Sequence, residues 1–233
     1  PRPLYAIVHK IPLTKMSELI ERSNSIKFYH DCDFNLESTY FDAKKKLFEL
    51  TFSINQASYD VPIEHEEWKI KCEETIDFRG FNNKILLPYI KIEIIEKHPL
   101  LLEYQEGKTD FFIKDAPLNL NEFYGEISMI LEKEFGNWIK LDDLFWNLED
   151  CFTKDKEKYL AISDSLLETV KTICGKYNIH YRSGKRQTGK DLGFYNKPNS
   201  KLLIFGNTDV CPNHYNFKQH YVIAKNFEFE RIK

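Results

Sequence analysis

The chain has 233 residues and a net charge of −3, and 42% of its residues are hydrophobic and 15% aromatic. This length allows one large domain or two small ones, while the near-balanced charge argues against a general nucleic-acid binder, which would be strongly basic. Five cysteines at irregular spacing argue against a secreted disulfide framework, and no apolar stretch is long enough to cross a bilayer. We therefore expect an intracellular protein, in the cytosol or in an organelle interior such as the mitochondrial matrix.

The first half of the chain is dominated by strand patterns. Residues 14–21 predict a short helix with Thr14 as its N-cap. Segments rich in β-branched and aromatic residues predict strands at 5–11, 26–30, 37–41, 47–54, 67–72 and 89–95. The segments 100–104 and 110–113 predict a hairpin across a turn at 106–108.

The second half mixes helices and strands. Residues 123–134 fit a strand as well as a helix, and 138–148 have apolar residues at helical spacing. The strongest helix pattern covers 158–177 and ends near Gly175. Two closing strands are expected at 202–205 and 221–229. Many short strands with a few helices predict an α+β fold, mainly antiparallel.

A basic stretch follows the predicted long helix. Residues 176–201 contain seven lysines and arginines against one acid, Asp191. Clustered cations create a local positive potential that favours phosphate or an acidic partner. A solvated loop explains the same composition equally well.

Three segments resemble the CYTH (triphosphate-tunnel) family, and within it the thiamine triphosphatases. They are 39–42 (Thr-Tyr-Phe-Asp), 68–72 (Trp-Lys-Ile-Lys-Cys) and 124–127 (Tyr-Gly-Glu-Ile). The resemblance implies a mainly antiparallel β-barrel with a few packing helices, enclosing a tunnel for triphosphate. It implies a CYTH-like domain over residues 1–199, with 200–233 as an added C-terminal β-hairpin.

The family's first strand carries a Glu-x-Glu-x-Lys signature, and this chain departs from it. Ala6 and Val8 replace both acids while Lys10 remains, and the arginines that the family places near 50–56 are absent. Those acids hold the divalent metal on which the family's chemistry depends, so their loss predicts lost catalysis.

We therefore expect a CYTH-like domain that has lost metal-dependent catalysis and serves as a structural or docking subunit, with a protein partner or larger assembly and no cofactor. One alternative is a triphosphate-binding protein or hydrolase with a reorganised site that uses Mg²⁺. In that site Glu126 is the catalytic acid, and the phosphate ligands are Lys10, Lys71, Arg182, Arg186 and Lys190. An apolar sheet interior would count against it, because unpaired phosphates cannot enter such a space.

Two further interpretations remain open. The chain is also consistent with an unrelated α+β interaction module or a small nuclease. A nucleic acid is not expected as its partner. Cys211, His214 and His220 carry zinc-type ligands, but an ordinary loop is the simpler interpretation of a set without a fourth ligand.

Overall fold

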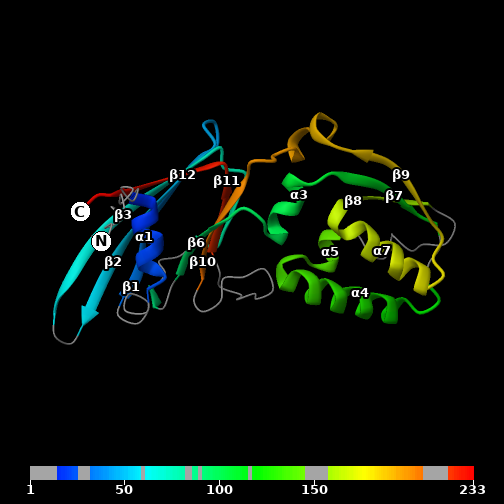
Figure 1. The fold of residues 1–233 in the computed structure, drawn as a ribbon, viewed down its shortest axis with the longest axis horizontal. Coiled ribbons are helices and arrows are strands. Elements are labelled where there is room, and N and C mark those ends of the chain that lie inside the picture. The colour runs from blue at the N-terminus through cyan, green and yellow to red at the C-terminus, as the bar shows by residue number, and fades with distance from the viewer. Residues whose placement is uncertain are drawn as a thin grey trace, which may run out of the picture.

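The computed structural model describes residues 15–25, 32–58, 61–81, 86–88, 91–114, 117–144, 157–206 and 220–233. They form two lobes arranged along the long axis of the molecule (Figure 1). One lobe, the sheet lobe, combines the described residues between 15 and 95 with those between 201 and 233. The other, the α/β lobe, is built by residues 99–197 and is thus inserted between two strands of the sheet lobe.

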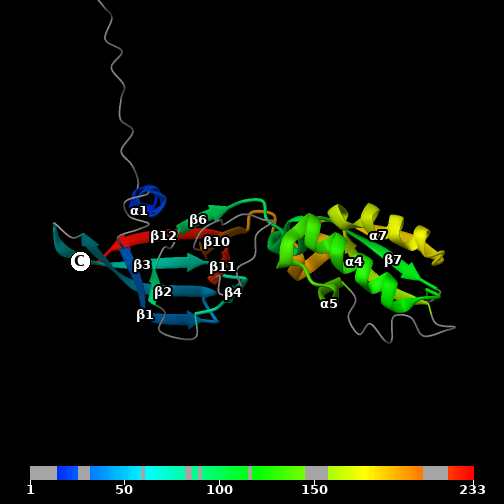
Figure 2. The ribbon, with the colours of Figure 1, turned by 90° about the horizontal axis from the view of Figure 1, so that it is seen from below.

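The sheet lobe contains two antiparallel sheets and a short helix. The first sheet has the order β12-β3-β2-β1-β5 and consists of β1 (Cys32–Asp42), β2 (Leu47–Ser58), β3 (Val61–Glu73), β5 (Leu86–Pro88) and β12 (Asn226–Arg231). The second has the order β4-β11-β10-β6 and consists of β4 (Asp77–Arg79), β6 (Lys91–Ile95), β10 (Lys201–Gly206) and β11 (His220–Ala224). The helix α1 (Lys15–Ser23) lies beside β12 and β6 (Figure 2).

A shared apolar core joins these two sheets. Alternate residues of β2 point into it, because side chains along a strand alternate between its faces. Its buried side chains include Phe48, Leu50, Phe52 and Ile54 of β2, Trp68 and Ile70 of β3, and Leu203, Phe205 and Val222 of the second sheet. The rings of Phe48 and Phe78 stack 4.2 Å apart across the core. The fold is α+β and mainly antiparallel as predicted, but the expected closed barrel is not found among the strands that the structure describes.

The α/β lobe has a three-stranded sheet with helices packed on one face. The antiparallel sheet, in the order β8-β7-β9, consists of β7 (Lys108–Ile113), β8 (Lys158–Ser163) and β9 (Tyr181–Gln187). The helices α4 (Leu120–Phe135) and α7 (Asp164–Lys176) cover the face that carries Phe111 and Ile113. Shorter elements are η1 (Pro99–Leu101), α3 (Leu102–Gln105), η2 (Gly136–Trp138), α5 (Leu141–Leu144) and η3 (Gly189–Tyr195).

Strands β10 and β11 connect the two lobes: one face of each strand packs in the sheet-lobe core and the other packs against the α/β lobe. Leu203 and Val222 point into the sheet-lobe core, while Ile204 and Ile223 point to the opposite face. On that face they meet Leu101 and Trp138 of the α/β lobe. The uninterrupted apolar runs of β10 and β11 follow from this position, since a strand buried on both faces has no polar side to present.

Several local predictions are corrected by the structure. The predicted strand at 100–104 is helical, as η1 and α3, because Pro99 begins a 3₁₀ turn that packs under the sheet lobe. The predicted helix at 158–177 is two elements, β8 and then α7, and Leu160 and Ile162 alternate with exposed Tyr159 and Ala161 as in a strand. The ambiguous segment 123–134 is helical, as part of α4.

Strands from either side of residue 199 share the same sheets. Strand β10 pairs with β6, β11 with β4, and β12 with β3. The segment 200–233, expected as an added hairpin, therefore supplies three strands to the sheet-lobe core. The predicted strands at 5–11 and 26–30 and the Thr14 cap lie outside the described residues.

Candidate functional site

The residues predicted to bind triphosphate do not converge. Lys71 lies on β3 between the buried Ile70 and Cys72, so its side chain points away from the core, toward Glu228 and Glu230 of β12. Glu126, Arg182, Arg186 and Lys190 lie in the other lobe (Figure 1). Lys10 lies outside the part of the chain that the structure describes.

Within the α/β lobe the predicted residues have other partners. Glu126 lies on α4, and it accepts hydrogen bonds from Lys176 Nζ at 2.6 Å and Tyr177 Oη at 2.7 Å. These hydrogen bonds lower the pKa of Glu126. Arg182 pairs with Glu157 and Arg186 with Asp164, so the cationic stretch is largely neutralised by acids of its own lobe.

The zinc-type spacing is not assembled in the described residues either. His220 is buried in β11 with its ring 5.3 Å from that of Phe81, whereas Cys211 and His214 lie outside the described residues. No group of three or more His, Cys, Asp or Glu side chains is placed to hold a metal ion in those ranges.

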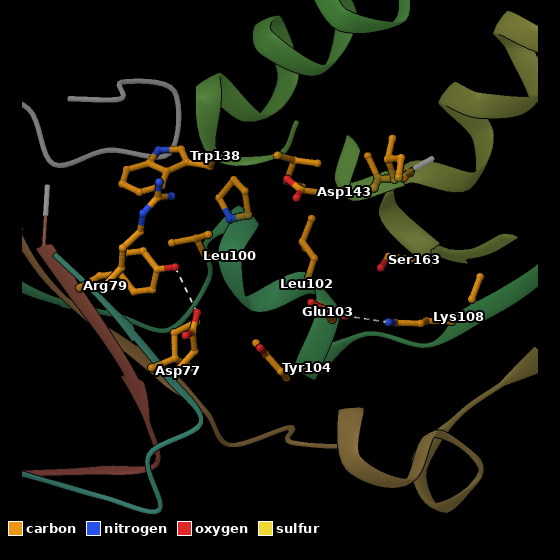
Figure 3. A pocket seen from close by; sticks show the side chains of 17 residues that line it. Asp77, Arg79, Leu100, Leu102, Glu103, Tyr104, Lys108, Trp138, Asp143 and Ser163 are labelled. Carbon is orange, nitrogen blue, oxygen red and sulfur yellow. Dashed lines mark hydrogen bonds and ion pairs between the residues drawn. The ribbon is translucent and has the colours of Figure 1, made fainter. Parts of the chain in front are cut away.

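A cavity of about 340 Å³ lies at the junction of the two lobes (Figure 3). Its lining comes from five regions of the chain: Asp77, Arg79, Pro99, Leu100, Leu102, Glu103, Tyr104, Lys108, Trp138, Ile139, Asp143, Leu144, Ala161, Ser163, Leu166, Tyr221 and Ile223. Junctions between lobes are common positions for ligand sites, and this volume is at the lower end of the range of about 300–1,000 Å³ for such sites. We therefore take this cavity as the candidate site.

Strand β4 supplies one acid and one base to the cavity. Asp77 and Arg79 are two residues apart on the strand and share the face opposite Phe78, which packs against the sheet-lobe core. Asp77 accepts hydrogen bonds from the backbone N–H of Phe78 at 2.8 Å and from Tyr221 Oη at 3.1 Å. Neither Asp77 nor Arg79 forms an ion pair within 4.0 Å among the residues described.

Two phenols lie beside these charges. Burial raises the pKa of Tyr221, and the nearby Asp77 carboxylate raises it further while the Arg79 charge opposes it. Burial also raises the pKa of Tyr104 to about 12, together with the charges of Glu103 and Asp77. Both hydroxyls therefore keep their protons at neutral pH. The proton of Tyr221 is donated to Asp77, whereas that of Tyr104 can be donated into the cavity.

The other end of the cavity is bounded by a paired lysine. Lys108 on β7 lies 3.5 Å from Glu103 Oε1 and 4.1 Å above the ring of Tyr195. Its charge is therefore already balanced by a carboxylate and an aromatic face. Buried Ser163 lies at this end of the cavity, whereas Trp138, also buried, lies at the β4 end beside Arg79 (Figure 3).

The lining residues that the structure describes include neither histidine nor cysteine. In the same part of the chain, the Ser163 hydroxyl has no hydrogen-bond partner that could act as its base. Sequence reasoning identified none of Asp77, Arg79, Tyr104 and Tyr221. The only sequence signal was the alternation of Asp77, Phe78 and Arg79, which predicts a short half-buried strand but no site.

Comparisons with known proteins assign this chain to no family. No helix within the described ranges is long and apolar enough to cross a membrane. No family model matches the sequence, and neither the curated proteins nor the solved structures contain a significant match.

Proposed function

We propose that this chain is a non-catalytic structural or docking domain that binds a partner protein in a larger assembly. The observation that carries the proposal is an aromatic face on the sheet of the α/β lobe that no described helix covers. The resemblance to the CYTH family stays a prediction within this proposal.

The interior of the sheet lobe supports the absence of triphosphate chemistry. The space between its two sheets is filled by phenylalanine, leucine, isoleucine and tryptophan side chains. A triphosphate placed there would lose its hydration without gaining cationic partners, at a cost of many kcal/mol. The lysine of the Trp-Lys-Ile-Lys segment that was expected in a tunnel, Lys71, points to the outer surface.

The uncovered face lies opposite α4 and α7. It consists of Asp110 and Phe112 of β7, Tyr159 of β8 and Arg182 of β9, and we call it the open sheet face. The guanidinium of Arg182 lies 3.6 Å from the centre of the Phe112 ring, and Tyr159 is 54% exposed. Tyr159 Oη and Gln187 Nε2 both donate to Asp110 Oδ1, at 2.9 and 2.7 Å, which orders the face before any partner binds.

The charges of β9 favour a protein over a nucleic acid. Arg182, Lys185 and Arg186 of β9 are paired with Glu157, Asp191 and Asp164. Little unbalanced positive charge therefore remains for a phosphate backbone, whose binding depends on it. Tyrosine and arginine are instead enriched at the centres of protein interfaces. Exposed Phe194 and Tyr195 of η3 add further aromatic surface in the same lobe.

Site-specific photo-crosslinking in the native cell tests the proposal. A photoreactive residue at Tyr159 should capture one protein partner, whereas the same residue at Met129 should not, because Met129 is 66% exposed on α4 at the covered side of the sheet. Tyr159→Ser should reduce recovery of the captured partner by about tenfold or more. Identical products at both positions, or no protein product at Tyr159, would refute the docking role.

Calorimetric titration with inorganic tripolyphosphate, with and without Mg²⁺, tests the alternative. We expect no heat of binding in either condition, because two of the predicted phosphate ligands, Arg182 and Arg186, are already paired with Glu157 and Asp164. Saturable binding that needs Mg²⁺ would support the triphosphate hydrolase instead and would overturn the proposed loss of catalysis.

A further inference from the structure

We propose that the cavity between the lobes binds a small zwitterion with an apolar side chain, the chemical class of the hydrophobic α-amino acids. This inference is independent of the docking role and concerns a different surface. It is based on one acid and one base that lie two residues apart on β4, on the phenols beside them, and on the apolar side chains that line the same cavity.

The charges of β4 match both ends of a zwitterion. Asp77 and Arg79 point to the same side of the strand, and their backbone positions are about 7 Å apart. They form no ion pair with each other, and no other ion pair of either is present within the described ranges. Asp77 is thus available to an ammonium group and Arg79 to a carboxylate, which it can bind through two parallel hydrogen bonds.

A ligand with only one kind of charge fits less well. A monoanion would bring a carboxylate close to Asp77, and a simple amine would bring its cation close to Arg79. In both cases a like charge on the neighbouring side chain weakens binding. The other base of the cavity, Lys108, is already paired with Glu103, so it does not change this balance.

The surrounding hydroxyls and apolar side chains define the rest of the ligand. Tyr221 Oη donates to Asp77 and holds that carboxylate in place at the cavity wall. The Tyr104 hydroxyl has no protein partner in the described chain and can bond to the ligand. Leu100 and Trp138 line the same cavity, and Figure 3 shows Leu100 between the β4 charges and Leu102. An apolar side chain of the ligand can pack against them, and a cavity of about 340 Å³ accommodates one amino acid and little more.

Isothermal titration calorimetry with three matched compounds tests the class of ligand. L-Phenylalanine has both charges, phenethylamine lacks the carboxylate, and hydrocinnamate lacks the ammonium group. We expect saturable binding of L-phenylalanine and binding weaker by about tenfold or more for each analogue, because each loses one charge-assisted contact. No binding of L-phenylalanine up to about 1 mM, or equal affinity for all three compounds, would overturn the proposal.

Two variants assign the charges to their residues. Asp77→Asn should weaken L-phenylalanine binding by about tenfold and leave hydrocinnamate binding unchanged or stronger. Arg79→Gln should weaken L-phenylalanine binding by a similar factor and leave phenethylamine binding unchanged or stronger. Lys185→Gln, which removes an exposed cation from β9, is the matched control and should bind as the unmodified protein does.

The melting temperature without ligand shows whether each variant is folded. In Asp77→Asn the amide oxygen can accept the hydrogen bond from the Phe78 N–H and the amide NH₂ can donate to Tyr221 Oη, so we expect little change in that variant. If both variants are folded and bind L-phenylalanine with unchanged affinity, the amino acid lies elsewhere and the inference is wrong. These results leave the crosslinking at Tyr159 unaffected, so the two proposals can fail separately.

Discussion

Replacing Glu66 by glutamine should destabilise the sheet lobe, because this buried carboxylate connects α1 to the first sheet. Its side chain is only 5% exposed and accepts hydrogen bonds from Arg22 Nη2 at 2.9 Å and Nη1 at 3.0 Å. It also accepts one from Trp68 Nε1 at 2.8 Å, and Arg231 lies 3.5 Å away. A glutamine can keep the bond from Trp68 but not the charge that balances the two arginines.

The expected loss is about 2–4 kcal/mol of the free energy of unfolding at neutral pH. Hydrogen bonds to charged groups contribute about 1.5–3 kcal/mol, and breaking a buried ion pair costs about 3–5 kcal/mol. We expect a loss below the upper end of the range for a buried ion pair, because Arg22 keeps 29% of its side chain exposed and can be partly rehydrated in the variant. Urea unfolding followed by circular dichroism measures the difference.

The pH dependence gives an independent check. Burial alone would raise the pKa of Glu66, but the hydrogen bonds from Arg22 and Trp68 and the charge of Arg22 hold it below its ordinary value of 4.5. A pKa lowered in the folded state means that the unfolded state binds more protons in this range. The stabilisation by Glu66 is therefore fully present above pH 4.5 and is lost as the pH falls through the folded-state pKa. Glu66→Gln should lack this acid-dependent loss.

Lys185→Gln is the control, since its pair with Asp191 is exposed at 71% and 52% and should contribute less than about 1 kcal/mol. If Glu66→Gln lies within about 0.5 kcal/mol of the unmodified protein at neutral pH, with an unchanged denaturant slope, the reasoning about this buried network is refuted.

Gly125→Ala should stabilise the protein by about 0.5–1 kcal/mol in urea unfolding, because Gly125 is inside α4 and an added Cβ meets nothing within 4 Å; a lower midpoint would contradict this. Gly80→Ala should destabilise the protein by about 1–3 kcal/mol in the same assay, because Gly80 has φ +92° and an added Cβ would lie 2.7 Å from the ring of His220. An unchanged unfolding midpoint would show that this turn can relax. Cys72 and Cys174 should react with a thiol reagent only after unfolding, because both are fully buried and burial raises the pKa of Cys174 to about 12. Peptide mass mapping measures the labelling, and rapid labelling of the folded protein would disprove that burial.

Side-chain periodicity was enough to locate many elements. The alternation of Phe48, Leu50, Phe52 and Ile54 predicted β2, and α1 lies where its helical pattern placed it. Periodicity failed where one apolar run fits two structures. Leu160 fits the helical stripe of α7 and also the alternation of β8, and only pairing with β7 decides between them. The run from Leu100 to Tyr104 is likewise helical because it packs on β10 and β11, which lie about a hundred residues further along the chain.

The candidate site was less accessible to sequence reasoning than the fold was. The family resemblance predicted phosphate ligands from residue type alone. Whether a cation can bind phosphate also depends on its ion pairs with other segments, such as those of Arg186 with Asp164 and of Arg182 with Glu157. The cavity itself has no linear motif. Asp77 on β4 accepts a hydrogen bond from Tyr221, which comes 144 residues later in the chain.

Apolar alternation and turn residues act locally, so the α+β class and the antiparallel character of the protein could be predicted from its amino-acid sequence. The three-dimensional structure was needed to show that a lobe formed by residues 99–197 is inserted between β6 and β10, and that the last three strands belong to the first lobe's sheets. It also decided which way Lys71 points and which charges remain unpaired beside the cavity. These features depend on strand register and on contacts between segments far apart in the chain, neither of which a local pattern contains.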